Sequence, residues 1–181
     1  MPTRLKARSG SSTWSRWSSE DPSPMIRRAT VVAVGALKGW AADGANDYLK
    51  RLRRLFPVEV VEVSEEDLNR RPPEEVLDIE GAKLLRRVPA GAYALALDRE
   101  KGVPLSSEKL AQQLNSLGLS GRSHVAFVLG GPLGLSPEAL KKSYALISFG
   151  PITLPHALAR VVLLEQIYRA TKINRGEKYH W

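Results

Sequence analysis

The sequence predicts an α/β protein built on one parallel sheet. From about residue 30 onward, short apolar runs alternate with segments whose apolar residues recur at helical spacing, which is typical of a parallel sheet covered by helices. The run at residues 92–97 is continuously apolar, as expected of a strand buried on both faces. A chain of 181 residues with 43% hydrophobic and 25% charged residues has the size and composition of one compact domain.

Five segments are predicted to form the strands of this sheet. They are residues 30–34, 58–63, 92–97, 125–129 and 145–148. The segment 58–63 alternates Val and Glu, which indicates one solvated face and a position towards a sheet edge.

Helices are predicted in the segments between and after the strands. Residues 43–56 place Ala45, Leu49 and Leu52 on one face, and a second helix opens at Pro72-Pro73 and extends to about residue 88. A third begins at residue 106 with leucines at i, i+4 and i+7, and a short fourth helix has Ser136 as its N-cap. A long helix at residues 155–172 is followed by a polar tail at 174–181.

Residues 1–24 are predicted to be a disordered extension, because they are rich in Ser, Arg and Pro and poor in aliphatic side chains. Residues 25–181 are predicted to form the single domain. Met25 directly precedes the first strand-like segment, so we expect it to be the natural start and residues 1–24 to be an over-extended reading frame. The alternative is an Arg- and Ser-rich targeting peptide, although it lacks the apolar region that secretion needs.

Composition excludes several classes of function. Without cysteine, the chain has no disulfide framework, thiolate metal site or cysteine nucleophile, which favours a reducing, cytoplasmic setting. No apolar run approaches the roughly 20 residues of a membrane span, and the three histidines lack metal-ligand spacing. The formal net charge of +8 favours a polyanionic partner such as nucleic acid.

Three loops that contain Gly or Pro follow predicted strands, at residues 98–104, 130–135 and 149–155. Ligand sites in open parallel sheets lie beyond the carboxyl ends of the strands, so these loops are the candidate site. Ordinary strand-to-helix turns are the alternative interpretation of each loop taken alone. Neither the dinucleotide motif GxGxxG nor the phosphate-binding motif GxxxxGK[ST] occurs, which disfavours the common nucleotide-binding sites.

Several short motifs occur in the order of one known family. They are Leu97-Asp98, Lys101-Gly102, Gly121-Arg122, Gly130-Gly131-Pro132, Gly134-Leu135-Ser136, Thr153-Leu154-Pro155-His156, Arg160, the segment 165–170 and Tyr179-His180. Together they resemble the ribosomal RNA large subunit methyltransferase H family, SPOUT-class enzymes that methylate N3 of a pseudouridine in helix 69 of bacterial 23S rRNA. The resemblance covers about residues 31–180.

The resemblance implies a parallel-sheet SPOUT methyltransferase fold with a C-terminal trefoil knot. It also implies a homodimer that uses S-adenosyl-L-methionine as methyl donor without a metal, acts on 23S rRNA within the ribosome or large subunit, and has no membrane partner. The cofactor-binding residues that it implies are Leu97, Gly131, Phe149, Gly150, Pro151, Ile152, Thr153 and Leu154.

The resemblance also indicates catalytic residues. The imide N3 carries a proton at neutral pH, so its methylation requires a general base or an environment that favours the deprotonated base. His180 and Tyr179 of the tail are the candidates, with simple solvation of the tail as the alternative. Arg160 is a third candidate, because a guanidinium among aliphatic residues needs an anion. That anion is an RNA phosphate or, alternatively, Glu165 or an acid of the partner subunit, and His156 is interpreted as a packing or capping residue.

The C-terminal region is the predicted RNA surface. Residues 141–181 hold seven basic and two acidic residues, and the RNA-binding candidates are Arg169, Lys172, Arg175, Lys178 and Trp181. Two positions depart from the family pattern: Leu133 replaces a frequent acid, and Trp181 replaces a frequent basic residue, although Trp181 could stack on a base. The alternatives are a non-catalytic RNA-binding or ribosome-assembly module of the same fold, or a SPOUT methyltransferase with another RNA target.

Overall fold

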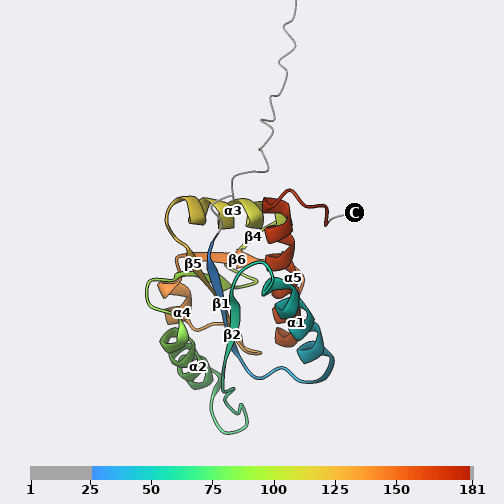
Figure 1. Cartoon of the computed structure of the whole chain (residues 1–181). Helices are drawn as coiled ribbons and strands as arrows, with labels where there is room; N and C mark the ends of the chain where they lie inside the picture. Colours follow the sequence, from blue (N-terminus) through green and yellow to red (C-terminus); the bar gives the residue numbers. More distant parts are fainter. Residues whose placement is uncertain (1–25, 180–181) are drawn as a thin grey trace, which may run out of the picture.

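The computed structural model describes residues 26–179, which form one six-stranded sheet with helices on both faces (Figure 1). The strands are β1 (Arg28–Val34), β2 (Val58–Val63), β3 (Tyr93–Leu97), β4 (Val103–Pro104), β5 (His124–Leu129) and β6 (Ala145–Ser148). Their order is β2-β1-β5-β3-β6-β4, and every pairing is parallel. The predicted α/β class is confirmed. The predictions for residues 1–24, Met25, His180 and Trp181 lie outside the described residues.

The helices within residues 26–179 divide between the two faces of the sheet. Side chains of α1 (Gly39–Leu52), α3 (Ser107–Leu119) and α5 (His156–Asn174) pack on one face. Those of α2 (Pro73–Arg87) and α4 (Pro137–Lys142) pack on the other. In Figure 1, α1 and α5 accordingly lie on one side of β1 and β2, and α2 and α4 on the other.

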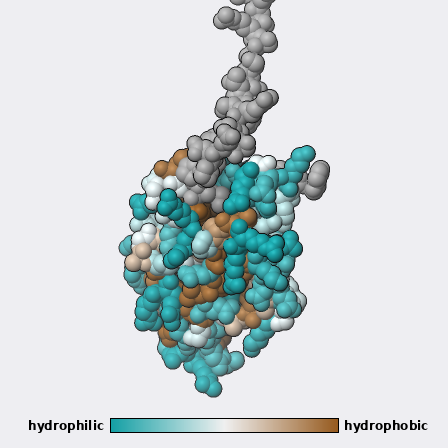
Figure 2. All heavy atoms as spheres, in the orientation of Figure 1, coloured by the Kyte–Doolittle hydropathy of each residue, from teal (hydrophilic) through white to brown (hydrophobic). Residues whose placement is uncertain are grey.

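The central strands are buried on both faces, which explains their continuous apolar runs. In β1, Val31 and Ala33 belong to the core under α1 and α5, whereas Val32 and Val34 belong to the core under α2 and α4. The strand β2 is at the sheet edge, as its Val and Glu alternation predicts. Figure 2 shows hydrophobic residues at the centre of this face, where Figure 1 draws β1 and β2, between hydrophilic surfaces on either side.

The bounds of α1 and the presence of β4 differ from the sequence prediction for identifiable reasons. α1 begins at Gly39 and ends at Leu52, four residues earlier at each end than predicted. A turn after Leu52 still buries Phe56, so the helical spacing of apolar residues continues past the helix. The strand β4 has two exposed residues and pairs only with β6, so no local pattern reveals it. The predicted cap Ser136 is confirmed, since its Oγ accepts from Ala139 N.

β6 lies between β3 and β4, although β3 and β4 are consecutive in the sequence. The connection between them is hydrogen-bonded to β6, because Asp98 N donates to Ile147 O at 2.9 Å and Leu105 N to Ser148 O at 3.2 Å. A side chain at Gly102 would collide with the carbonyl oxygens of Asp98 and Ile147, so this close approach requires glycine. The predicted trefoil knot requires insertion of a later strand in this way, and the knot itself stays a prediction.

No helix among residues 26–179 is both long enough and apolar enough to cross a lipid bilayer.

A candidate cofactor cleft at the carboxyl ends of β3, β5 and β6

The three loops selected from the sequence surround one cleft with a volume of about 1020 Å³. Each loop follows a strand, and β5, β3 and β6 are neighbours in the sheet, so their carboxyl ends meet at the same edge. The volume is at the upper end of the range for small-molecule sites, about 300–1,000 Å³. This edge of the sheet therefore has room for a ligand of nucleoside size.

The loop after β5 is a tight turn built on glycines. Gly134 N donates to Gly131 O at 3.0 Å, and Gly134 has a φ of 86°, which favours glycine. A side chain on Gly130 would collide with the carbonyl group of Gly134. The turn ends at Ser136, which caps α4. Because the glycines of this turn lack side chains, main-chain groups of the loop stay open to a bound ligand.

The loop after β6 presents both polar and apolar groups. Gly150 N donates to Ser148 Oγ at 2.9 Å, which fixes the start of the loop. Ile152 lines the cleft and is 66% exposed, so its apolar side chain is accessible to a ligand. Thr153 Oγ1 accepts from Arg99 at 3.1 Å and so ties this loop to the loop after β3. An apolar ligand face would cover Ile152.

The loop after β3 is held by its own aspartate. The Asp98 carboxylate accepts from Glu100 N at 3.0 Å and from Lys101 N at 2.7 Å, the hydrogen bonds of an Asx-type turn. The main chain of residues 98–101 is therefore fixed at the mouth of the cleft without a ligand.

Most of the predicted cofactor residues come together in this cleft. Leu97, Gly131, Phe149, Gly150, Ile152, Thr153 and Leu154 line it, whereas Pro151 is exposed and does not. The cleft also includes residues that the sequence analysis did not select as cofactor contacts, among them Leu129, Leu140 and His156. Their only sequence signal is their position near strand ends or at a helix start.

Glu80 of α2 lies beneath the glycine turn. It is 2% exposed, its Oε1 accepts from Glu66 N at 2.9 Å, and its Oε2 has no partner among the described residues. A Cβ on Gly131 would lie 3.0 Å from this oxygen. Burial raises the pKa of Glu80, which favours the neutral acid. The burial of Glu80 could not be predicted from the sequence, because Glu80 is one of several charged residues in α2.

Arg160 does not line the cleft. It is 1% exposed, and its guanidinium donates to Glu62 at 2.6 Å, to Val34 O at 2.7 Å and to Gly35 O at 2.8 Å. Burial lowers the pKa of Arg160, and Glu62 partly offsets this. Of the alternative partners expected for Arg160, Glu165 is not the one found among residues 26–179, because Arg160 binds Glu62 of the edge strand. Its guanidinium joins α5 to β1 and β2.

Tyr179 also lies away from the cleft of its own chain. Its ring packs edge-on against Tyr168 at 4.9 Å, and the Arg169 guanidinium lies 4.7 Å from the ring centre. Tyr168 is twelve residues beyond His156, about 18 Å along α5 at 1.5 Å per residue. Burial, followed by the hydrogen bond with Tyr48, raises the pKa of Tyr179 to about 12. The phenol is therefore a hydrogen-bonding group and a poor proton acceptor at neutral pH.

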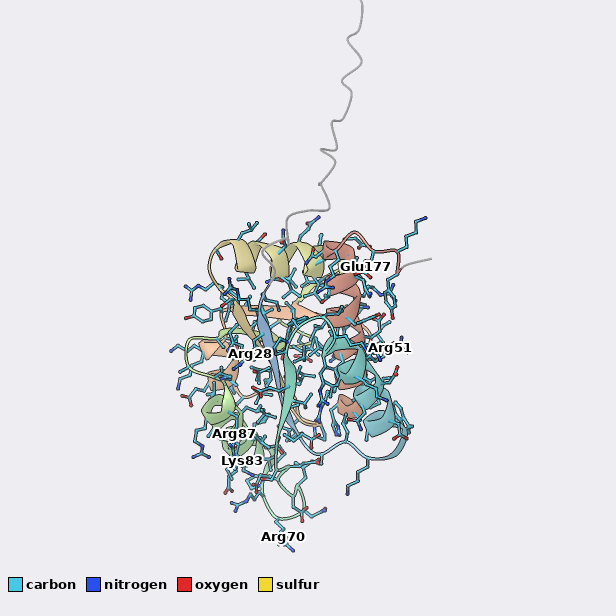
Figure 3. All side chains as sticks on the ribbon, in the orientation of Figure 1. Arg28, Arg51, Arg70, Lys83, Arg87 and Glu177 are labelled. Atoms are coloured by element: carbon cyan, nitrogen blue, oxygen red, sulfur yellow. The ribbon has the colours of Figure 1, made fainter. Side chains whose placement is uncertain are left out.

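Ion pairs engage several of the predicted RNA-binding cations. Arg169 donates to Glu165 at 2.9 and 2.6 Å, and Lys172 pairs with Glu177. Arg175 donates to Leu55 O at 3.2 Å and lies 3.9 Å from Glu177, which Figure 3 labels near the end of α5. Lys178 is exposed and makes no ion pair among residues 26–179. Local acids thus partly neutralise this surface.

In the part of the chain that the structure describes, no group of three or more His, Cys, Asp or Glu residues is placed to hold a metal ion. The main-chain groups of the loops and the side chains that line the cleft, among them Leu97, Thr153 and His156, can bind and orient a ligand.

Comparison with known proteins agrees with this architecture. A family model described as "Predicted SPOUT methyltransferase" matches residues 27–180. A protein of Rubrobacter xylanophilus named ribosomal RNA large subunit methyltransferase H is 64% identical over 158 residues, 87% of this chain and 100% of that protein. Proteins of the same name from Pelotomaculum thermopropionicum and Listeria monocytogenes are each 46% identical, covering 84% and 83% of this chain and 98% and 97% of their own lengths.

A solved structure shares the fold. The crystal structure of a methylase family protein from Neisseria gonorrhoeae matches with a TM-score of 0.50 and 19% identity, over 81% of this chain and 84% of that one. With a parallel sheet, a glycine-lined cleft at its carboxyl edge and relatives matched over nearly their whole length, the chain belongs to the ribosomal RNA large subunit methyltransferase H family of SPOUT methyltransferases.

Proposed function

We propose that this protein is a cytoplasmic enzyme that transfers a methyl group from S-adenosyl-L-methionine to N3 of a pseudouridine in helix 69 of 23S rRNA. The main support for this proposal is the cleft, because three separate loops build it and seven of the eight cofactor-binding residues implied by the family resemblance line it. The names of the relatives support large-subunit rRNA as the substrate.

The donor set of the cleft fits the proposed cofactor. Main-chain N–H and C=O groups of residues 130–134 and 149–154 suit the polar edge of an adenine and an amino-acid head group. Leu97, Ile152 and Leu154 supply apolar contacts for a ring face, and the Ile152 side chain is exposed to such a ligand. When bound, the cofactor supplies an electrophilic methyl group on a sulfonium.

The residues of the chain then act mainly by positioning. Methyl transfer is an in-line displacement, so holding the target nitrogen in line with the methyl group provides much of the acceleration. If bound in the cleft, S-adenosyl-L-methionine would supply the methyl group, and the proton on N3 would have to pass to a base of the protein. We assign this base role to His180 and a base-orienting hydrogen bond to Tyr179, whose phenol keeps its proton at neutral pH.

A homodimer brings these groups to the cleft. Tyr179 of one chain packs on Tyr168, which is nine residues or about 13.5 Å along α5 beyond Ala159 at the cleft, so it is out of reach of its own cofactor loops. We therefore propose that the tail of one chain completes the cleft of the second copy. Equimolar mixing of an Ile152→Glu chain with a His180→Ala chain would then restore transfer, because one composite site of the mixed dimer is intact.

Calorimetric titration of the full chain with S-adenosyl-L-methionine tests the cleft. Ile152→Glu should weaken binding at least about tenfold, since a carboxylate would replace an apolar contact, whereas Val103→Glu should leave it unchanged. Val103 is a matched control, because it is 63% exposed and does not line the cleft. Equal binding by both variants would place the cofactor elsewhere. No binding by the unaltered chain would favour the non-catalytic assembly module.

A further inference from the structure

We propose that the amino-terminal edge of the sheet, opposite the cleft, binds a second segment of RNA by stacking a base on Tyr144 and neutralising phosphates with surrounding cations. This inference rests on the proposed function only for the identity of the RNA as ribosomal. The surface, its chemistry and its test stand on the described residues.

Topology places four segments at this edge. Because β1, β5, β3 and β6 are neighbouring parallel strands, the residues that lead into them meet at one edge. These are segments 26–29, 88–94, 120–126 and 141–145, which contain no Asp or Glu. The start of β2 lies beside the start of β1 at the same edge and carries Glu59. The cations of the four segments are Arg27, Arg28, Arg122, Lys141 and Lys142.

Most of these cations have no acid to neutralise them. Within residues 26–179, Lys142 forms a salt bridge with Glu138 at 2.7 Å, and the other four form none. Burial and then nearby Arg28 lower the pKa of His124, whereas Glu59 raises it, so Arg28 and Glu59 both act on this ring. Unpaired cations are free to release counterions on contact with phosphates.

The backbone holds some of these cations together. Arg27 N and Arg28 N both donate to Ser123 O, at 2.7 and 3.1 Å, so the two arginines lie beside the loop that carries Arg122. Figure 3 shows Arg28 on the α2 side of the sheet, the side to which Val32 and Val34 of β1 also point.

An exposed aromatic platform lies within this ring of charge. Tyr144 is 61% exposed, and its ring stacks on Tyr93 with centroids 4.7 Å apart and planes 15° from parallel. Tyr144 N donates to Ala94 O at 2.9 Å, which fixes the ring position. The Arg122 guanidinium lies 5.7 Å from the centre of the Tyr144 ring. A preordered aromatic ring beside a guanidinium is the arrangement on which single-stranded bases stack.

The position of this platform separates it from the methylated base. Tyr144 is four residues before Ser148, which lines the cleft, so the two are about 13 Å apart along β6 at 3.3 Å per residue. A base on Tyr144 therefore belongs to a different nucleotide from the one in the cleft. The contact would orient a folded RNA on the enzyme and should act on substrate recognition, leaving cofactor binding and the chemical step unchanged.

Tyr144→Ala and Tyr144→Phe form the test pair, because Phe keeps the stacking face and loses only the hydroxyl. We expect Tyr144→Ala to raise the KM for ribosomal particles about tenfold at unchanged kcat, with unchanged cofactor titration, and Tyr144→Phe to behave as the unaltered chain. Arg122→Ser combined with Arg27→Ser should flatten the salt dependence of binding to a single-stranded RNA oligonucleotide by about 0.7 per lost phosphate contact. Thermal unfolding verifies that each variant is folded.

The oligonucleotide measurement also separates this inference from the proposed function. If the enzyme failed to methylate ribosomal particles but oligonucleotide binding still required Tyr144, the methylation proposal would fall and this surface would stand. If folded Tyr144→Ala bound the oligonucleotide and the particles as tightly as the unaltered chain, the inference would be overturned. A shift of Tyr144→Ala from dimer to monomer in light scattering would also overturn it, since the edge would then be a protein interface.

Discussion

Replacement of Glu62 by Gln tests whether Arg160 has a structural role. The substitution keeps an oxygen within reach of the guanidinium but removes the charge that offsets the burial of Arg160. Breaking a fully buried ion pair costs about 3–5 kcal/mol. Glu62 itself is 39% exposed, so solvent screens part of the interaction and we expect a loss of about 2–3 kcal/mol.

For a chain of this size, 1 kcal/mol corresponds to about 2–4 °C in Tm, so Glu62→Gln should melt about 4–12 °C below the unaltered chain. Differential scanning calorimetry measures this, and methyl transfer well below the Tm should persist. The double variant Glu62→Gln with Arg160→Met should lose less free energy of unfolding than the two single variants lose together, because it leaves no unpaired buried charge. Unchanged Tm with abolished transfer would refute this reasoning and give Arg160 the catalytic role expected from the sequence.

Three further variants test the cleft and its surroundings. Gly130→Ala should weaken cofactor binding in calorimetry at least about tenfold, because its methyl group would collide with the Gly134 carbonyl and open the turn; undiminished binding would contradict this. Glu80→Gln should gain stability relative to the unaltered chain as pH rises above 4.5. Since burial raises the Glu80 pKa, folding favours its protonated form, and ionisation destabilises the fold at higher pH. Melting curves at pH 4 and 8 that show no widening difference would contradict it. Tyr179→Phe should leave the pH profile of transfer below pH 10 unchanged in shape, because the Tyr179 pKa is about 12; loss of a titration from that profile would identify Tyr179 as the base.

The sequence predicts most of the sheet because its strands are buried on both faces and the helices between them have regular apolar spacing. It also locates the cleft, since Gly and Pro mark loops at strand ends. Partners that depend on tertiary packing leave no such pattern. Arg160 and Glu62 are 98 residues apart, and nothing local distinguishes Glu62 from Glu165 as the partner. The two-residue β4 has no pattern of its own and forms only because β6 is beside it.

The position of the C-terminal tail also could not be predicted from the sequence. Motif order selects Tyr179 as catalytic, but only the folded chain shows that the residue packs on α5 away from its own cleft. The stacked pair Tyr93 and Tyr144 is also invisible in the sequence, because the two residues come from strands that become neighbours only in the sheet.

The most direct measurement is mass spectrometry of 23S rRNA from ribosomal particles that lack the modification, after incubation with the full chain and S-adenosyl-L-methionine carrying a labelled methyl group. The account predicts one labelled methyl group on a pseudouridine of helix 69, and none with the Ile152→Glu chain. A label on another nucleotide would contradict the proposed target. Absence of label from all RNA, with the cofactor bound, would contradict the enzymatic function.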